Sequence, residues 1–252
     1  MDNLFDSPDM AAGYARARPA LHPRIIGLAG KYLQPLPVEN ALDVGCGAGL
    51  STRALESIAR HCHGIDPSES MIQCATDLWP GSIFSPGTAE KLPVPSHSID
   101  LITAAGSLNY ADLNQFFPEA LRVLSPHGRL LVYDFGQGRS FRNSPALDGW
   151  FSEFLKRYPM PPDSGREISP ETLASHRSGL QPTGHELFEI GLMLDPAFYI
   201  NYVMTETNIA HAISTGKSGE SIRAWCDLTI PAVFENRSRE VLFSGYISIL
   251  SR

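Results

Sequence analysis

One short stretch of the sequence limits the fold more than any other. The apolar run Ala41–Val44 leads into three closely spaced glycines, Gly45, Gly47 and Gly49. Glycines at this spacing let the backbone turn sharply and approach a ligand that a Cβ atom would exclude. A strand that enters a glycine-rich turn and continues as a helix is typical of the first part of a nucleoside-binding α/β unit.

Two carboxylates and one leucine indicate which kind of nucleoside fits this turn. Asp66 ends the next apolar segment, about 20 residues further on, where a carboxylate accepts hydrogen bonds from ribose hydroxyls. Asp43 lies inside the first strand, where its charge would repel a pyrophosphate but suit an ammonium group. Leu50 occupies the position at which the nicotinamide fingerprint has its third glycine. The pattern therefore favours a nucleoside that carries an ammonium group and no phosphate.

The run Leu-Asp-Val-Gly-Cys-Gly-Ala-Gly over residues 42–49 resembles the first motif of class I S-adenosylmethionine-dependent methyltransferases. The resemblance covers about residues 1–135 and is weak beyond them. It implies an α/β fold, with a doubly wound, Rossmann-like, mainly parallel seven-stranded sheet, helices on both faces and a helical cap. It also implies S-adenosylmethionine as the cofactor and S-adenosylhomocysteine as the product.

The resemblance further implies which residues bind the cofactor. Asp43 would hold the methionine ammonium, with or without a bridging water, and Asp66 would bind the ribose hydroxyls. Thr88 stands where the family commonly has an aspartate that contacts adenine, so this part of the sequence departs from the pattern. The complete set of expected cofactor contacts is Asp43, Gly45, Cys46, Gly47, Asp66, Pro67, Met71, Thr88, Ala89, Glu90 and Ala105.

The acceptor side is less defined in the sequence. Many relatives have a histidine near Asn109, and asparagine cannot replace it as a base because it has no ionisable proton near neutral pH. That role is either absent in this chain or taken by another residue. Methyl transfer depends mainly on alignment, which can lower a barrier by roughly 7–11 kcal/mol. Tyr14, Arg18, Asn109 and Tyr110 are the expected substrate contacts, and Tyr14, His22 and Tyr110 are candidate bases.

Hydrophobic periodicity predicts strands that alternate with helices, as in a parallel sheet. We expect a helix over 21–32, another over 49–60 and a third over 113–124, in which Pro118 starts the main part. A helical insertion and a loop are expected over 136–183, and further helices over 195–235. The strands are expected at 40–45, 62–66, 83–84, 99–105, 129–135, 185–194 and 239–250.

This pattern predicts one methyltransferase domain spanning 1–252 with four parts. They are an N-terminal lid over 1–39, a cofactor-binding core over 40–135, a cap and substrate region over 136–235, and a terminal strand over 236–252.

Composition excludes several classes of partner. The net charge of −7 argues against a nucleic-acid backbone as the main ligand. The four cysteines form no Cys-x-x-Cys pair, and His61, Cys62 and His63 have no further ligands nearby, so we expect no metal and a reducing compartment. No apolar run reaches the ~20 residues of a membrane span and no signal peptide is evident. We expect a cytoplasmic protein with a small-molecule substrate and no membrane or nucleic-acid partner; its oligomeric state is not determined by sequence.

The sequence thus predicts an S-adenosylmethionine-dependent methyltransferase that acts on a small molecule by in-line displacement. Two alternatives remain open. A protein that binds the cofactor without catalysis would carry the same motifs. An NAD(P)-dependent oxidoreductase would need a glycine at Leu50 and an apolar residue at Asp43, and the sequence has neither.

Overall fold

The structure is a computed structural model that describes residues 8–162, 165–176 and 178–252. The chain divides into two compact units, each built from separated segments. The sheet unit consists of Ala20–Phe135, Gly165–Phe188 and Gly245–Arg252. The helical unit consists of Met1–Pro19, Gly136–Ser164 and Glu189–Ser244. Residues 20–39, expected to belong to the lid, therefore cluster with the sheet.

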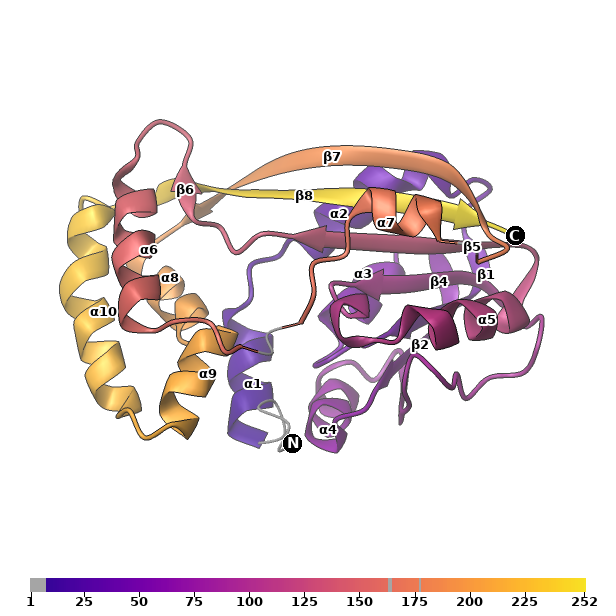
Figure 1. Cartoon of the computed structure of the whole chain (residues 1–252), viewed down its shortest axis with the longest axis horizontal. Helices are drawn as coiled ribbons and strands as arrows, with labels where there is room; N and C mark the ends of the chain where they lie inside the picture. The colour runs from indigo at the N-terminus through magenta and orange to yellow at the C-terminus, as the bar shows by residue number, and fades with distance from the viewer. Residues whose placement is uncertain (1–7, 163–164, 177) are drawn as a thin grey trace. The chain divides into compact units, whose positions relative to one another are not determined.

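The sheet unit contains a twisted sheet in the order β3-β2-β1-β4-β5-β8. Its first five strands are parallel, and β8 runs antiparallel to β5 (Figure 1). Since parallel strands end on one edge, the residues that follow β1, β2, β4 and β5 meet there. The strands are β1 Val38–Val44, β2 Ala59–Asp66, β3 Ile83–Pro86, β4 Ile99–Ala105, β5 Leu124–Phe135, β7 Gln181–Leu194 and β8 Arg239–Ser251.

The core of the sheet unit forms where interior strands meet α5. Leu101, Ile102 and Ala104 on β4 are buried, as expected for a strand covered on both faces. Helix α5 turns Phe116 and Phe117 onto this core, and neither side chain is exposed. The helices are α2 His22–Ala29, α3 Leu50–Leu55, α4 Glu69–Leu78, α5 Leu113–Val123 and α7 Pro170–Ser175, with 3-10 turns η1 Gly30–Tyr32 and η2 Leu108–Tyr110.

Helix α5 differs from the sequence prediction at Pro118. We expected this proline to start the main helix, but it lies inside a continuous helix that begins at Leu113 after the cap residue Asp112. The Asp112 carboxylate accepts the N–H of Asn114 and fixes the helix start. Proline removes one helical hydrogen bond, and burial of the apolar stripe on the same helix outweighs that loss.

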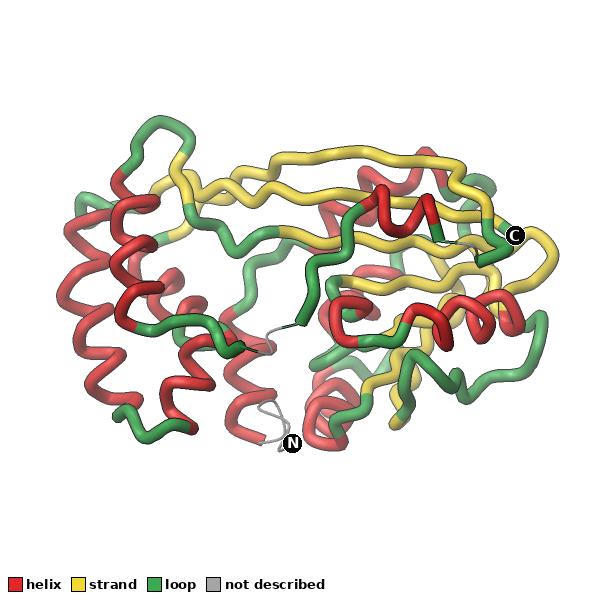
Figure 2. Tube along the Cα trace, in the orientation of Figure 1, coloured by secondary structure: helices red, strands yellow, loops and turns green. Residues whose placement is uncertain are grey.

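The helical unit has a core of aromatic side chains. The Trp150 ring stacks on Phe154 at 5.0 Å and on Trp225 at 5.3 Å between ring centroids. Figure 2 shows the helices of this unit side by side, and contacts join α10 to α8 and α6. The expected helices in 136–183 and 195–235 are confirmed. The elements are α1 Pro8–Ala17, β6 Ser140–Phe141, α6 Ala146–Arg157, α8 Pro196–Val203, α9 Thr207–Ser214 and α10 Gly219–Val233.

The described residues form an eight-stranded sheet, one strand more than the seven expected. The additional strand is the two-residue β6, whose Phe141 pairs with Val241 of β8 inside the helical unit. A strand this short carries no periodicity that a sequence pattern can detect. The predicted class, a mainly parallel α/β sheet with helices, is confirmed.

Candidate functional site

The glycine turn between β1 and α3 uses backbone conformations that favour glycine. Gly45, Gly47 and Gly49 have φ values of +71°, +51° and +83°. A Cβ atom on Gly45 would lie 2.3 Å from Cβ of Ser107, and one on Gly49 would lie 2.6 Å from Cδ1 of Trp79. A Cβ atom on Gly47 would meet nothing within 4 Å. The outer glycines therefore permit close packing, whereas Gly47 borders open space.

Asp66 joins the end of β2 to this turn. Its Oδ2 accepts the N–H of Gly47 at 2.9 Å, and its Oδ1 accepts the N–H of Ser68 at 2.9 Å. These two bonds fix the carboxylate between the glycine turn and the residue that caps the next helix. The side chain is partly exposed. The structure thus brings a hydrogen-bond acceptor beside the one glycine of the turn that faces open space.

Asp43 is held in a different way, because its carboxylate has no solvent exposure. Its Oδ2 accepts the hydroxyls of Ser51 at 2.6 Å and Thr52 at 2.7 Å, and its Oδ1 accepts that of Thr103 at 2.7 Å. Burial raises the pKa of Asp43, and the three hydroxyls act in the opposite direction. Asp43 therefore ties β1 to the start of α3 and to β4. The ammonium contact expected for it stays a prediction.

The other expected cofactor residues in this region fall into buried and exposed groups. The Cys46 thiol is buried, and burial raises its pKa, so it is an inert thiol at neutral pH. Met71 is also buried, on the inner face of α4, whereas Pro67 is exposed. Ala105 ends β4 in register with Tyr133 of β5.

The loop after β3 turns back on itself between Thr88 and Lys91. Thr88 is exposed, and Ala89 packs against the core. The carboxylate of Glu90 accepts the N–H of Asp112 at 2.9 Å, which fixes the loop against the start of α5. Adenine contacts by these residues stay predictions.

The loop after β4 brings together two residues from different strand ends. The Asn109 amide donates to Oδ2 of Asp134 at 2.8 Å, and Oδ1 of Asp134 accepts the N–H of Phe135 at 2.8 Å. Asp134 lies next to the last residue of β5 and was not among the residues selected from the sequence. Its position at the carboxyl end of a parallel strand is the signal that could have identified it.

The candidate bases lie in different surroundings. Nδ1 of His22 is 2.8 Å from the buried Tyr133 hydroxyl, and Tyr110 is 63% exposed. Both belong to the sheet unit. Tyr14 and Arg18 belong to the helical unit, where the Arg18 guanidinium lies 4.1 Å from the Tyr14 ring centroid and donates to the Thr205 carbonyl at 3.1 Å. His22 and Tyr110 thus belong to one unit, and Tyr14 and Arg18 to the other.

Comparison with known proteins places this site in a family. The methyltransferase-domain family matches residues 42–132, which contain the glycine turn, Asp66 and the loop after β4. An uncharacterized methyltransferase of Mycobacterium bovis is 32% identical over 117 residues, which are 46% of this chain and 46% of that protein. The match therefore spans about half the length of that relative.

Two further proteins are similar to this chain, one in sequence and one in fold. A demethylmenaquinone methyltransferase of Tropheryma whipplei is 38% identical over 106 residues, covering 41% of this chain and 44% of that protein. A structure from Anaeromyxobacter dehalogenans, described as a type II methyltransferase, superposes with a TM-score of 0.68 at 23% identity over 92% of this chain and 95% of that chain. Residues 42–132 thus match a methyltransferase domain. At this identity the structural likeness concerns the fold alone.

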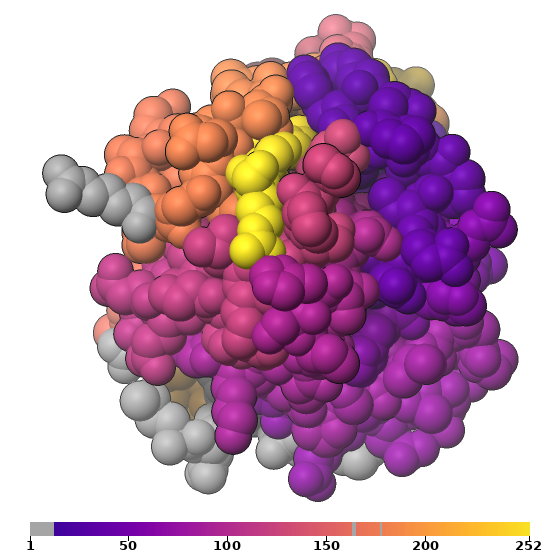
Figure 3. Space-filling view, turned by 90° about the vertical axis from the view of Figure 1, so that its right-hand side faces the viewer, coloured from indigo at the N-terminus to yellow at the C-terminus, as the bar shows by residue number. Residues whose placement is uncertain are grey.

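Outside the methyltransferase domain, each unit has a surface depression of its own. In the sheet unit, a groove of about 200 Å³ lies between α7 and the end of β8. Figure 3 shows the yellow end of β8 at the surface beside orange atoms, which have the colour of β7 in Figure 1. The lining of the groove is mainly apolar and includes Leu173, Pro182, Ile249 and Leu250.

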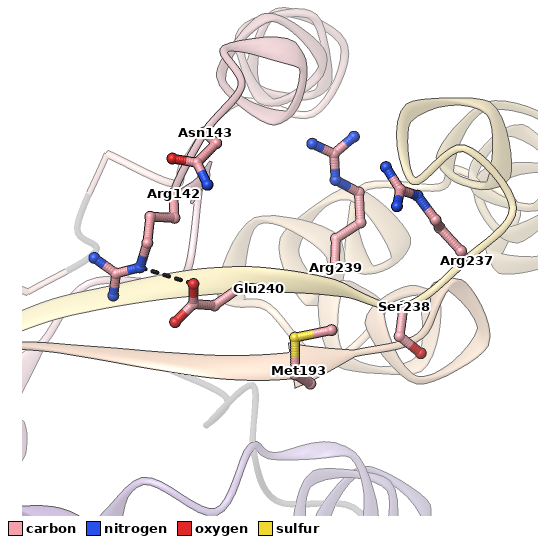
Figure 4. A pocket seen from close by; sticks show the side chains of 7 residues that line it. All are labelled: Arg142, Asn143, Met193, Arg237, Ser238, Arg239 and Glu240. Carbon is pink, nitrogen blue, oxygen red and sulfur yellow. Dashed lines mark hydrogen bonds and ion pairs between the residues drawn. The ribbon is translucent and has the colours of Figure 1, made fainter.

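The depression in the helical unit, also about 200 Å³, contains three arginines (Figure 4). Arg142 donates to Glu240 at 2.7 Å, and Arg237 and Arg239 each pair with Glu235 at 2.6 Å. Carboxylates therefore balance these positive charges. Within the described ranges, no helix is long and apolar enough to cross a membrane, and no cluster of three or more metal-ligating side chains occurs.

Proposed function

We propose that the chain is an S-adenosylmethionine-dependent methyltransferase that methylates a small molecule. One observation carries the proposal: Asp66 accepts the N–H of Gly47, the glycine of the turn that borders open space. A carboxylate that could bind ribose thereby lies next to a stretch of backbone that a ligand could approach closely, as nucleoside binding requires. The match of residues 42–132 to the methyltransferase-domain family supports the same donor.

The residues present fit the donor. The Asp66 carboxylate would accept the two ribose hydroxyls, and the open side of Gly47 would admit the methionine portion. Pro67 is exposed next to Asp66 and would lie against the adenine. Asp43 would act through the turn that it fixes, or through a water, because its carboxylate is buried.

When bound, the donor supplies a methyl group that its sulfonium already activates. The protein must therefore align an acceptor with that methyl and exclude water, and such alignment accounts for a large part of catalysis in transfers of this kind. The loop Gly106–Tyr110 after β4 would border the acceptor. Its conformation is fixed by a hydrogen bond from Gly106 N–H to the Tyr133 carbonyl at 2.9 Å and by the Asn109–Asp134 bond.

A small acceptor fits the charge of the chain. The net charge of −7 disfavours nucleic acid, whose binding depends on positive side chains. The similarity to a demethylmenaquinone methyltransferase covers less than half of either protein, so it supports the reaction type and leaves the acceptor open.

The first test is calorimetric titration with S-adenosylmethionine, S-adenosylhomocysteine and NAD. We expect the first two to bind and NAD not to bind. Asp66→Ala should weaken S-adenosylhomocysteine binding by a factor of about 10 or more, because it removes the charged acceptor for the ribose hydroxyls. Asp77→Ala, an exposed carboxylate on α4, is the matched control and should bind as the wild type does.

Each other result has a defined meaning. Binding of NAD alone would favour the oxidoreductase alternative. If Asp66→Ala bound S-adenosylhomocysteine as tightly as the wild type does, the Asp66 carboxylate would not be the ribose acceptor. Binding of S-adenosylmethionine without labelled methyl transfer to phenols, amines, thiols or carbon acids would favour a protein that binds the cofactor without catalysis.

A further inference from the structure

We propose that Asp134, held by Asn109, is the group that binds and deprotonates the methyl acceptor, and that the acceptor carries an O–H or N–H group. This inference rests on the proposed function. The loop after β4 has Asn109, which cannot act as a base, and the inference gives the proton-accepting role to Asp134. Asn109 positions the carboxylate, and Asp134 is the catalytic residue.

The position of Asp134 relative to the glycine turn follows from contacts inside the sheet unit. Ser107 donates its hydroxyl to the Val44 carbonyl at the end of β1, and its Cβ faces Gly45. The preceding residue, Gly106, has a φ of +67°, and a Cβ atom there would lie 3.0 Å from Oδ1 of Asp134. The loop after β4 therefore lies between the glycine turn and the carboxylate, in contact with both.

The hydrogen bonds of Asp134 leave it able to accept a proton. One oxygen accepts the Asn109 amide and the other accepts the N–H of Phe135, so each keeps one acceptor position. Burial raises the pKa of Asp134, these two bonds lower it, and the nearby charge of Glu167 raises it. Tyr246 also interacts with Asp134, and its own pKa is raised by burial. A carboxylate with a raised pKa is a stronger base than an exposed one.

The charges around Asp134 also select the acceptor. The charge of Glu167 acts on Asp134, and Asp66 ends β2 on the edge of the sheet unit where β5 also ends. Negative charge there disfavours a carboxylate or phosphate acceptor and favours a neutral or cationic one. Phenols, alcohols and amines meet this condition and also carry the proton that a base must remove.

Methyl transfer to such an acceptor combines two bond changes with one proton transfer. A lone pair of the acceptor oxygen or nitrogen forms a bond to the methyl carbon, and the carbon–sulfur bond breaks with its electron pair going to sulfur. The acceptor proton moves to the Asp134 carboxylate, which becomes a neutral carboxylic acid and later releases the proton to water. The products are the methylated acceptor and S-adenosylhomocysteine.

Sinefungin tests the inference without knowledge of the acceptor. It is a donor analogue with a protonated primary amine in place of the S-methyl group, and S-adenosylhomocysteine has nothing there. We expect Asp134→Asn to weaken sinefungin about tenfold or more and to change S-adenosylhomocysteine affinity less than about twofold, since a charged hydrogen bond contributes at least this much. Calorimetry at pH 7.5 measures both affinities.

Asp100→Asn is the matched control. Asp100, at the start of β4, also accepts one backbone N–H, from Asn40, and one side-chain donor, Ser125, but at the opposite edge of the sheet. It should leave both affinities unchanged. An equal effect of Asp134→Asn on the two ligands would overturn the inference, whereas a wild-type protein that binds neither ligand would overturn the proposed function and this inference with it.

A second variant covers the case in which Asp134→Asn does not fold. Asn109→Ala removes a hydrogen bond that lowers the pKa of Asp134. The pH above which the protein prefers sinefungin to S-adenosylhomocysteine should therefore move upward. An unchanged pH dependence would contradict the inference.

Discussion

Each unit of this protein buries a carboxylate completely, and the two units stabilise it by different means. Asp43 in the sheet unit is 0% exposed and accepts three hydroxyls. Glu206 in the helical unit is 1% exposed, and neither of its oxygens has a hydrogen-bond partner among the described residues. It precedes α9 as the cap residue, yet its side chain does not cap the helix.

Two arginines act electrostatically on the buried Glu206 carboxylate. Arg18 and Arg139 favour its ionised form, but burial dominates and raises the pKa of Glu206 to about 7. Hydroxyl donors fix the position of a carboxylate, whereas a positive charge that forms no hydrogen bond with it only lessens the cost of burying it. We therefore expect Asp43 to stabilise the fold and Glu206 to reduce its stability when ionised.

Asp43→Ala should have the largest effect. It leaves three buried hydroxyls without their acceptor, and we expect the free energy of unfolding at pH 7 to fall by about 3–5 kcal/mol. Asp43→Asn keeps an acceptor oxygen and should lose less. Urea unfolding measures both, with the exposed Asp77→Ala as the control; equal stability of Asp43→Ala and the wild type would break the comparison.

Glu206→Gln should act in the opposite direction and only at higher pH. The folded protein holds the Glu206 proton up to about pH 7, while the ordinary value is 4.5. The wild type should therefore lose about 3 kcal/mol of stability as pH rises from 4.5 through 7, and the glutamine variant should not show this loss.

The measurement is the difference in unfolding free energy between Glu206→Gln and the wild type at pH 5 and pH 8. Glu220→Gln, an exposed glutamate on α10, serves as the control. A glutamine variant that is less stable at pH 8 would show that Glu206 forms stabilising bonds in solution.

Thr103→Val should have the smallest effect of the three changes. It keeps the volume and removes one hydroxyl from Asp43, so we expect a loss of about 1–2 kcal/mol and a further rise in the pKa of Asp43. Thr76→Val on the exposed face of α4 should stay within about 0.5 kcal/mol. If Thr103→Val lost no more unfolding free energy than this control, the Thr103 hydroxyl would not be what stabilises the buried Asp43 carboxylate.

The sequence predicted best where the structure depends on local pattern. The apolar run of β4 has the bounds expected for it, Ile99–Ala105. The helix expected over 49–60 ends at Leu55 because Ile58 N–H bonds to the Leu55 carbonyl in a turn and β2 already begins at Ala59. Strand β5 starts five residues earlier than expected, since Leu124 pairs with Ile99.

The residues of the candidate site divide in the same way, into those of a local motif and those that strand pairing brings together. The glycines and Asp66 lie in a motif that can be read from adjacent residues. Asp134 and Thr103 matter only because strand pairing places them beside Asn109 and Asp43, which are 25 and 60 residues away in the sequence. Thr103 is a polar residue in a mainly apolar strand, and only the fold shows that its hydroxyl bonds to Asp43.

The segments of the two units alternate along the sequence, which limits when each unit can fold during synthesis. Residues 245–252 complete the sheet unit by pairing with β5, and 189–244 complete the helical unit. During translation, the edge of β5 therefore stays unpaired while the more than one hundred residues between β5 and β8 are synthesised. Neither unit can finish folding as an early N-terminal domain, so both depend on nearly the whole of this chain leaving the ribosome. A nascent chain stalled before β8 would expose that edge to chaperones or to self-association.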